Sequence, residues 1–264
     1  MKNRFACLFA FFAALPAQAV EISLRDTWEL NRPGSLAFDH EMCVLWVANE
    51  SRELVQMSVF GEIIQRIETD LSMVKTVTPT ADGVLVSDWK GLFQNVSRDG
   101  TLDGEPFGLN LKLYDTEGVA KDADGNLLIV QDTPAHMLHL TPSGDIIGEL
   151  DGMSMTPRMV EPQGIAVDPQ SGHIFITDDL EGSNSLYEFA PDWSLLSVTP
   201  LREYGIDPEA IAVSPQLRTI YIGFDQGAKI AVFEYEPEGD PFEPAIETSF
   251  GCGLSAFSNG KSPV

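Results

Sequence analysis

The chain has 264 residues, and 44% of them are hydrophobic, which is enough apolar material for a sizeable core. Its 40 acidic residues face only 16 basic ones, giving a formal net charge of −24 at pH 7. Such a surface repels nucleic-acid phosphates and anionic lipid headgroups, so nucleic-acid binding is excluded, whereas cationic partners and divalent metals are compatible. After the N-terminal region no segment has the length and apolarity of a transmembrane helix, so we predict a protein that is not embedded in a membrane.

Residues 1–19 have the features of a secretory signal peptide. Lys2 and Arg4 supply a positive start, Phe5 to Leu15 is an unbroken apolar run, and Ala17-Gln18-Ala19 offers small residues to signal peptidase. The apolar run is too short for a permanent bilayer-spanning helix. We therefore predict that residues 1–19 are removed and that residues 20–264 form a single domain that is periplasmic or secreted. Both charged residues in the removed segment are basic, so the mature chain would carry a formal charge of −26.

One phrase recurs along the rest of the chain: a turn or acidic residue, a short apolar strand, a polar turn, a second apolar strand and a third. Its clearest copy runs from Glu161 to Phe189, and four others begin at Pro33, Val74, Asp115 and Asp207. The corresponding residues Leu36, Val77, Val119, Ile165 and Ile211 are 41, 42, 46 and 46 residues apart. This is the length of one four-stranded blade, so the sequence predicts an all-β protein, a β-propeller.

The two ends of the repeat region predict how the ring closes. Ile22 to Leu30 suits an outermost strand that closes the ring against the C-terminal blade, and Gly253 to Gly260 resembles the first strand of a sixth blade. We therefore expect about six blades, with five as the alternative. An oxidising compartment permits a disulfide between Cys43 and Cys252. The repeat register, however, places them toward opposite ends of their blades and predicts that they do not pair.

The phrase PQGIAVDPQSGHIFITDD, from Pro162, resembles the NHL-type repeat, and EGVAKDADGNLLIVQD, from Glu117, is similar to repeats of the SdiA-regulated family and of the gluconolactonase group. The gluconolactonase resemblance implies one divalent cation at the channel mouth and hydrolysis of sugar lactones. Among the cation's ligands it implies a glutamate that opens an innermost strand and an aspartate that closes a second strand, matched here by Glu117 and Asp178. The group's asparagine before glycine is Gln163 in this chain, and its EGP opening has no counterpart in the first copy.

Blade geometry itself predicts a candidate site, because the second strand of a blade returns to the face where the first begins. Residues just before the first strands therefore share a face with those that close the second strands. In register, the residues before the first strands are Gly34, Lys75, Glu117, Gln163, Glu209 and Cys252. Those that close the second strands are Asn49, Asp88, Asp132, Asp178 and Asp225. Hard oxygen ligands without His or Cys suit Ca²⁺ or Mg²⁺. We expect a divalent cation held by some subset of Glu117, Asp132, Asp178 and Glu209. The alternative is that the aspartates accept hydrogen bonds from backbone amides of the loops that follow.

Two functions are compatible with these observations. The first is an exported binding platform for an unknown protein or small-molecule ligand. The alternative is a divalent-metal-dependent hydrolase of a lactone or another ester, with Glu117 and Asp178 as ligands and Asp132 or Glu209 as the base. A hydrolase needs a pocket with a cation beside an unliganded carboxylate, whereas a platform presents exposed apolar or aromatic groups on a broad face.

Overall fold

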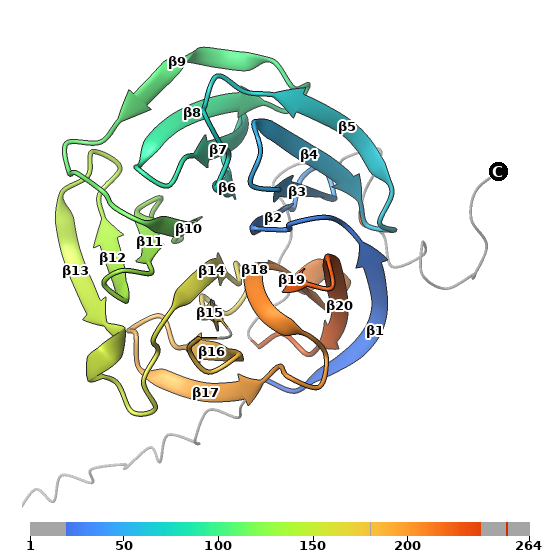
Figure 1. Cartoon of the computed structure of the whole chain (residues 1–264), viewed down its shortest axis with the longest axis vertical. Helices are drawn as coiled ribbons and strands as arrows, with labels where there is room; N and C mark the ends of the chain where they lie inside the picture. The colour runs from blue at the N-terminus through green and yellow to red at the C-terminus, as the bar shows by residue number, and fades with distance from the viewer. Residues whose placement is uncertain (1–19, 180, 239–251, 253–264) are drawn as a thin grey trace, which may run out of the picture.

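Short apolar runs bounded by turn residues form the strands of this protein. Val44–Ala48 (VLWVA) and Ile174–Asp178 (IFITD) are rich in β-branched and aromatic residues, which favour extended backbone. The computed structural model describes residues 20–179, 181–238 and 252. Within them the strands form five antiparallel four-stranded sheets, set as blades around a central axis (Figure 1). The fold is an all-β, five-bladed β-propeller.

Blades 1 to 4 each contain four consecutive strands, numbered from the axis outward. Blade 1 has β2 (Ser35–Asp39), β3 (Val44–Ala48), β4 (Glu53–Ser58) and β5 (Ile63–Glu68). Blade 2 has β6 (Thr76–Pro79), β7 (Gly83–Ser87), β8 (Leu92–Ser97) and β9 (Leu102–Gly108). Blade 3 has β10 (Thr116–Lys121), β11 (Leu127–Gln131), β12 (His136–Leu140) and β13 (Ile146–Asp151). Blade 4 has β14 (Pro162–Val167), β15 (Ile174–Asp178), β16 (Ser185–Phe189) and β17 (Leu195–Pro200).

Blade 5 joins the two ends of the repeat region. It contains β18 (Ile206–Ser214), β19 (Thr219–Gln226) and β20 (Lys229–Tyr235), and its outermost strand is β1 (Ile22–Glu29). β1 pairs antiparallel with β20, with Ile22 opposite Tyr235 and Glu29 opposite Lys229. Figure 1 shows the blue β1 beside the red β20. The expected closure by an N-terminal strand is confirmed.

The expectation of six blades is wrong, and the alternative of five is right. β2 of blade 1 packs directly beside β18 of blade 5. A Cβ added at Gly223 of β19 would lie only 2.6 Å from the Pro33 carbonyl oxygen, just ahead of β2. The ring is thus closed without room for a further blade between these two. The segment from Gly253 to Gly260, read above as a sixth first strand, lies outside the described residues.

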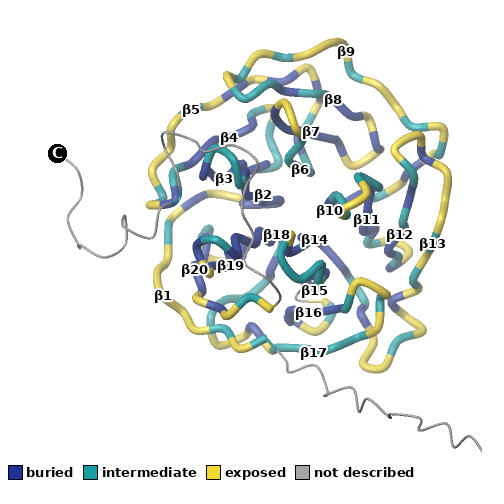
Figure 2. Tube along the Cα trace, turned by 180° about the vertical axis from the view of Figure 1, so that it is seen from behind, coloured by how far each residue is buried: buried dark blue, intermediate teal, exposed yellow. Residues whose placement is uncertain are grey.

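The core consists of apolar clusters between neighbouring blades. In β3, Leu45 and Val47 pack into the cluster shared with blade 5, whereas Val44 and Trp46 pack into the one shared with blade 2. Since both faces of an inner strand meet another blade, the strand reads as an unbroken apolar run instead of an apolar–polar alternation. Figure 2 shows the inner strands buried and the outermost strands largely exposed. Among the described residues, no helix is long and apolar enough to cross a bilayer.

The prediction that the two mature cysteines do not pair is also wrong. Cys43 and Cys252 form a disulfide, with their Cα atoms 5.5 Å apart. Cys43 lies in the turn between β2 and β3. The register argument placed Cys252 just before the first strand of a sixth blade, and so at the opposite end of the blades from Cys43. Because the ring closes with five blades, Cys252 follows the last blade and packs against the core cluster between blades 1 and 5.

Candidate functional site

The end of the central channel where the innermost strands begin, called the mouth below, gathers the first-strand residues predicted from the repeat register. Lys75 directly precedes β6, and Glu117, Gln163 and Glu209 lie near the starts of β10, β14 and β18. In those three strands the pairing register shifts at these residues, between Thr116 and Gly118, Pro162 and Ile165, and Pro208 and Ala210. A β-bulge bends a strand and re-aims its side chains, so each bulge turns a polar side chain out of the regular ladder.

Small residues follow these polar ones because neighbouring innermost strands approach closely. A Cβ added at Gly118 would lie 2.5 Å from the Gln163 carbonyl oxygen, and one at Gly164 would lie 2.8 Å from the Ala210 Cα. Such contacts are too short for any side chain larger than hydrogen. The recurring pattern of a polar residue followed by Gly or Ala therefore packs three blades tightly while it delivers their polar side chains to the mouth.

Lys75 is a buried cation of the mouth. Its Nζ lies 2.5 Å from Glu117 Oε2 and 2.7 Å from Glu50 Oε1, and the Lys75 and Glu117 side chains are only 12% and 7% exposed. Burial alone would lower the pKa of Lys75, but the charges of Glu117 and Glu50 outweigh it and raise that pKa. Lys75 stays charged and neutralises part of the buried acid.

The Gln163 amide lies among three further carboxyl groups of the mouth. One of its terminal atoms is 3.3 Å from Asp179 Oδ2, and the other is 2.8 Å from Glu117 Oε2 and 3.3 Å from Glu209 Oε2. With its nitrogen directed toward the two glutamates, the amide donates to both. A neutral donor at this position relieves crowding among the acids without adding a second positive charge.

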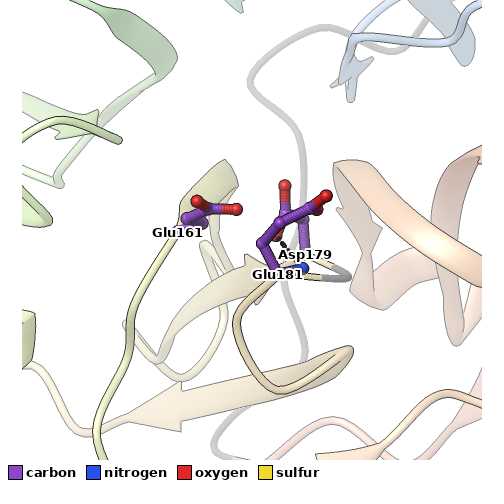
Figure 3. Close-up of side chains that lie close together, drawn as sticks. All are labelled: Glu161, Asp179 and Glu181. Carbon is purple, nitrogen blue, oxygen red and sulfur yellow. Dashed lines mark hydrogen bonds between the residues drawn. The ribbon is translucent and has the colours of Figure 1, made fainter.

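Other carboxylates of the mouth, besides the Glu117 and Glu50 that pair with Lys75, cluster around Asp179. Asp179 is buried and directly follows β15. Oxygens of Glu161, Asp179 and Glu181 lie within 4.8 Å of one another, and so do oxygens of Asp179, Asp207 and Glu209. Figure 3 shows Glu161 across a short gap from Asp179 and Glu181. We call Glu161, Asp179, Glu181, Asp207 and Glu209 the acidic cluster.

Two members of the acidic cluster, Glu161 and Glu209, hold protons more tightly than ordinary carboxyl groups. Burial, followed by the charges of Asp207 and Glu117, raises the pKa of Glu209 to about 8 even though Lys75 opposes the shift. Desolvation, together with a hydrogen bond to Asp179 and its charge, raises the pKa of Glu161 to about 8. At neutral pH the mouth therefore stores protons that a bound cation would displace.

The structure separates the four predicted metal ligands. Glu209 belongs to the acidic cluster. Glu117 is engaged by Lys75, and Asp178 accepts hydrogen bonds from the backbone amides of Val160, Glu161 and Ser183. Asp132 follows β11, and burial and the charges of Asp115 and Asp179 raise its pKa. For Asp178, the alternative of a loop-bonding aspartate describes its contacts.

Sequence reasoning missed the other members of the acidic cluster. Glu161 and Asp207 each lie two positions before a predicted mouth residue, as does Asp115 before Glu117, so the spacing acidic–x–Glu/Gln repeats in three blades. That periodicity could have revealed them. The sequence prediction names Asp178 and not its neighbour Asp179, because choosing between adjacent residues needs the direction in which the chain leaves β15.

The opposite end of the channel has a different character. A cavity of about 620 Å³ opens there, lined by apolar first-strand residues such as Val77, Val119 and Ile165 and by the turns between first and second strands. His139, which pairs with Asp122 at 2.7 Å, and Trp193 stand at its edge. The channel is thus acidic at the mouth and mainly apolar at its other end.

Comparison with known proteins establishes the fold. No family model matches the chain, and no curated protein matches it. Among solved structures, glutaminyl cyclase from Myxococcus xanthus is 12% identical with a TM-score of 0.61, covering 82% of this chain and 97% of its own. A protein of unknown function from Bacteroides thetaiotaomicron is 16% identical with a TM-score of 0.55, covering 78% and 60%. A chain of a nidogen/laminin complex is 18% identical with a TM-score of 0.54, covering 80% and 79%. At these identities the likeness concerns the β-propeller fold alone.

Proposed function

We propose that this protein is an exported, non-catalytic binding platform whose mouth takes a cationic ligand. The observation that carries the proposal is the acidic cluster, whose carboxylate oxygens lie within 4.8 Å of one another in two groups. Lys75 is paired with Glu117 and Glu50, outside those groups. Converging carboxylates in a partly buried site attract a positive charge, because each loses favourable solvation and repels its neighbours.

Two exposed aromatic side chains beside the mouth favour an organic cation. Trp89 follows the end of β7 and is 42% exposed, and Tyr114 precedes Asp115 and is 55% exposed. The Trp89 carbonyl oxygen accepts a hydrogen bond from the Thr116 amide at the start of β10, which places Trp89 at this end of the ring. Aromatic faces attract ammonium and guanidinium groups, and each ring already holds a lysine ammonium of this chain: Lys90 lies over Trp89 and Lys112 over Tyr114, both 4.6 Å from the ring centroid. A ligand cation would displace these lysines or use the opposite ring faces. The proposed ligand is therefore an amine or a basic peptide.

A metal-dependent hydrolase is the second candidate, supported by the same carboxylates. Asp179, Asp207 and Glu209 offer hard oxygen ligands suited to Ca²⁺ or Mg²⁺. A bound cation would supply polarisation of an ester or lactone carbonyl. Glu161, with its pKa raised to about 8, has a protonation equilibrium suited to proton transfer near neutral pH.

Thermal unfolding at constant ionic strength tests both candidates, with spermidine and Ca²⁺ as separate probes. A probe bound only by the folded state at 100 times its dissociation constant adds about 2.7 kcal/mol of stability. We expect spermidine to raise the midpoint in the native protein and not in Asp179→Asn/Glu209→Gln. Glu149→Gln, which removes an exposed charge from β13, is the matched control and should keep the shift.

The two probes separate the candidates. A shift with spermidine alone supports the platform for organic cations. A shift with Ca²⁺ that disappears in the double variant supports the second candidate and justifies assays with lactones and esters. No shift with either probe would contradict a cation site at the mouth.

A further inference from the structure

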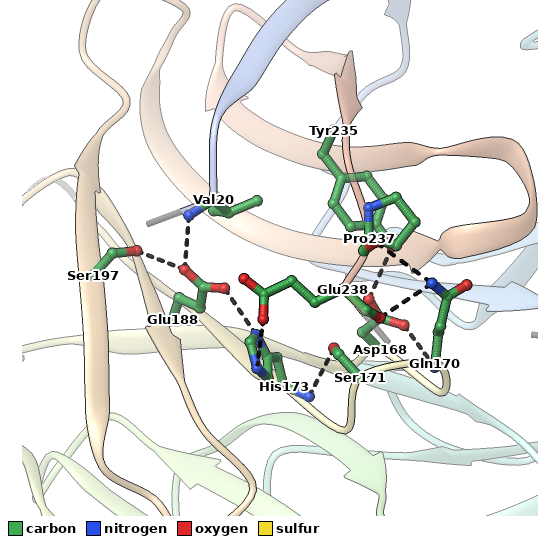
Figure 4. A network of polar contacts seen from close by, with 10 residues as sticks. All are labelled: Val20, Asp168, Gln170, Ser171, His173, Glu188, Ser197, Tyr235, Pro237 and Glu238. Atoms are coloured by element: carbon green, nitrogen blue, oxygen red, sulfur yellow. Dashed lines mark hydrogen bonds and ion pairs between the residues drawn. The ribbon is translucent and has the colours of Figure 1, made fainter. Parts of the chain in front are cut away.

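A second polar site lies between blades 4 and 5, outside the acidic cluster of the mouth. Its centre is Glu188 in β16, whose side chain is only 3% exposed. Glu188 Oε1 lies 3.0 Å from His173 Nδ1, and Glu188 Oε2 accepts hydrogen bonds from Ser197 Oγ at 2.8 Å and from the Val20 backbone nitrogen at 3.0 Å (Figure 4). A buried carboxylate needs such partners, because burial alone would raise its pKa. Here the hydrogen bonds outweigh burial and lower the pKa of Glu188.

The position of Val20 is fixed by packing. Val20 and Ile22 pack against the apolar cluster between blades 4 and 5, and Ile22 pairs with Tyr235 at the end of the β1–β20 ladder. A small cavity of about 250 Å³ is lined by Val20, His173 and Glu188. The nitrogen is therefore held against Glu188 by the same contacts that close the ring.

Val20 is also the first residue after the predicted signal-peptidase site Ala17-Gln18-Ala19. Addition of water across the Ala19–Val20 peptide bond leaves a carboxylate on Ala19 and an α-ammonium group on Val20. We propose that Glu188 is the binding partner of this new α-ammonium group. Removal of the signal peptide then converts the neutral hydrogen bond from the Val20 nitrogen to Glu188 into a buried ion pair. A charge-assisted hydrogen bond is about twice as strong as a neutral one. The processed ring is then more stable than its precursor.

Other titratable groups around the site act on the same ammonium. His173 comes from the turn before β15, Asp168 follows β14, and Glu236 and Glu238 follow β20. Asp168 accepts a hydrogen bond from Tyr235 Oη at 3.1 Å, and Glu238 lies 4.0 Å from His173 Nε2. Glu21, next in the chain, is exposed. Acidic groups predominate, so the surroundings as a whole favour the charged form of the amine.

The test uses the full chain expressed with its own signal in an exporting host. Intact mass should first show that the recovered protein begins at Val20. The α-amine pKa is then measured from the pH dependence of its acetylation rate. We expect a pKa above about 9, because an α-amine ordinarily titrates near 7.7–8.0 and a close carboxylate raises it by about one to three. Insertion of Gly-Ser between Ala19 and Val20 moves the new terminus away from Glu188 and should restore the ordinary value.

Stability supplies the second readout. An amine whose folded-state pKa is raised contributes stability below its unfolded value and loses it as the pH rises through the folded value. At pH 7 the protein that begins at Val20 should therefore have a higher midpoint of thermal unfolding than the Gly-Ser insertion variant. The two midpoints should converge near pH 10. Glu188→Gln should abolish the difference, whereas Glu21→Gln should keep it. If Glu188→Gln does not fold, the comparison of the native protein with the Gly-Ser insertion variant is sufficient to test the ion pair.

Two results would overturn the inference: a recovered protein that does not begin at Val20, or an α-amine with the ordinary pKa in the native start. The inference shares only the export of the chain with the proposed function. Cation binding at the mouth is measured separately, so either proposal can fail while the other stands.

Discussion

At the scale of single residues, Lys75 determines how much negative charge the mouth retains. It contacts Glu117 and Glu50, and its charge also acts on Glu209. Without Lys75, the carboxyl groups of Glu117, Glu50 and Glu209 would have to become protonated or move into contact with solvent. The mouth is therefore built as one buried cation within an excess of acid, and the acid outside its direct contacts remains available to a ligand.

Lys75→Met should destabilise the protein by about 3 kcal/mol, since removing one partner of a buried ion pair strands the other's charge. The free energy of unfolding in urea at pH 7 measures the effect. Adding Glu117→Gln should recover part of the loss, because a neutral amide replaces the stranded carboxylate. Lys112→Met, at an exposed lysine stacked on Tyr114, is the control and should change stability by less than about 0.5 kcal/mol. If the two lysine substitutions changed the free energy of unfolding equally, the buried Lys75–Glu117 pair would contribute no more to stability than an exposed lysine does.

The sequence predicted the residues of the mouth better than their roles. Glu117, Gln163 and Glu209 could be placed there because the repeat register fixes where each innermost strand begins. Their partners could not, because the Lys75–Glu50 contact joins two blades and depends on how they pack. Asp178 and Asp179 are adjacent in the sequence, and both accept backbone hydrogen bonds from the loops around them. Only the path of the chain after β15 brings Asp179 into the acidic cluster as well.

At the scale of the elements, the strands and their blades followed from short apolar runs spaced by turn residues. The number of blades did not, because the closing strand β1 comes from the other end of the chain and completes a blade of only three C-terminal strands. The error about the cysteines followed directly. An assumed sixth blade put Cys252 before a first strand, at the opposite end of the blades from Cys43.

Loss of the Cys43–Cys252 disulfide should lower stability by about 2–5 kcal/mol. The crosslink joins residues 209 positions apart, so it restricts the unfolded chain strongly. The measurement compares urea unfolding of the native protein with that of Cys43→Ser/Cys252→Ser, which has no thiol at either position and cannot form the crosslink. Labelling of the urea-unfolded native protein with a thiol reagent is the control, and it should be negative until a reductant is added. Full labelling without reductant would show that the two cysteines are unpaired in solution.

At the scale of the whole molecule, part of the strong excess of acid is gathered at one end of the channel instead of being spread only over the surface. The formal charge of −24 keeps the protein soluble and repels anionic partners. The mouth adds carboxyl groups that are protonated near neutrality, so the charge of this end changes within the ordinary pH range. Folding stability is consequently linked to these protons, and the cation binding proposed above would be linked to the same ones.

Stability should fall as the pH rises from about 6.5 to 8.5. Glu161 and Glu209 have folded-state pKa values of about 8 against an ordinary 4.5, so the folded protein binds more protons than the unfolded chain between these values. Their contribution is complete below the ordinary value and is lost as the pH passes through about 8. His173, whose pKa Glu188 raises, acts in the same direction. His40, whose pKa burial lowers to about 4, opposes them only between about 4 and 6.5, outside this window.

Urea unfolding at intervals across this window measures the slope, and substitutions identify its source. Glu161→Gln/Glu209→Gln should make the slope shallower and raise stability at pH 8.5, because neutral amides replace carboxyl groups that ionise unfavourably there. Glu149→Gln removes the same kind of charge from an exposed outer strand and should leave the slope unchanged. A cation bound at the mouth should also flatten the slope, since it replaces the protons, and its affinity should increase toward pH 8.5. Parallel slopes in all three proteins would place the protons elsewhere and remove the link between folding and the mouth.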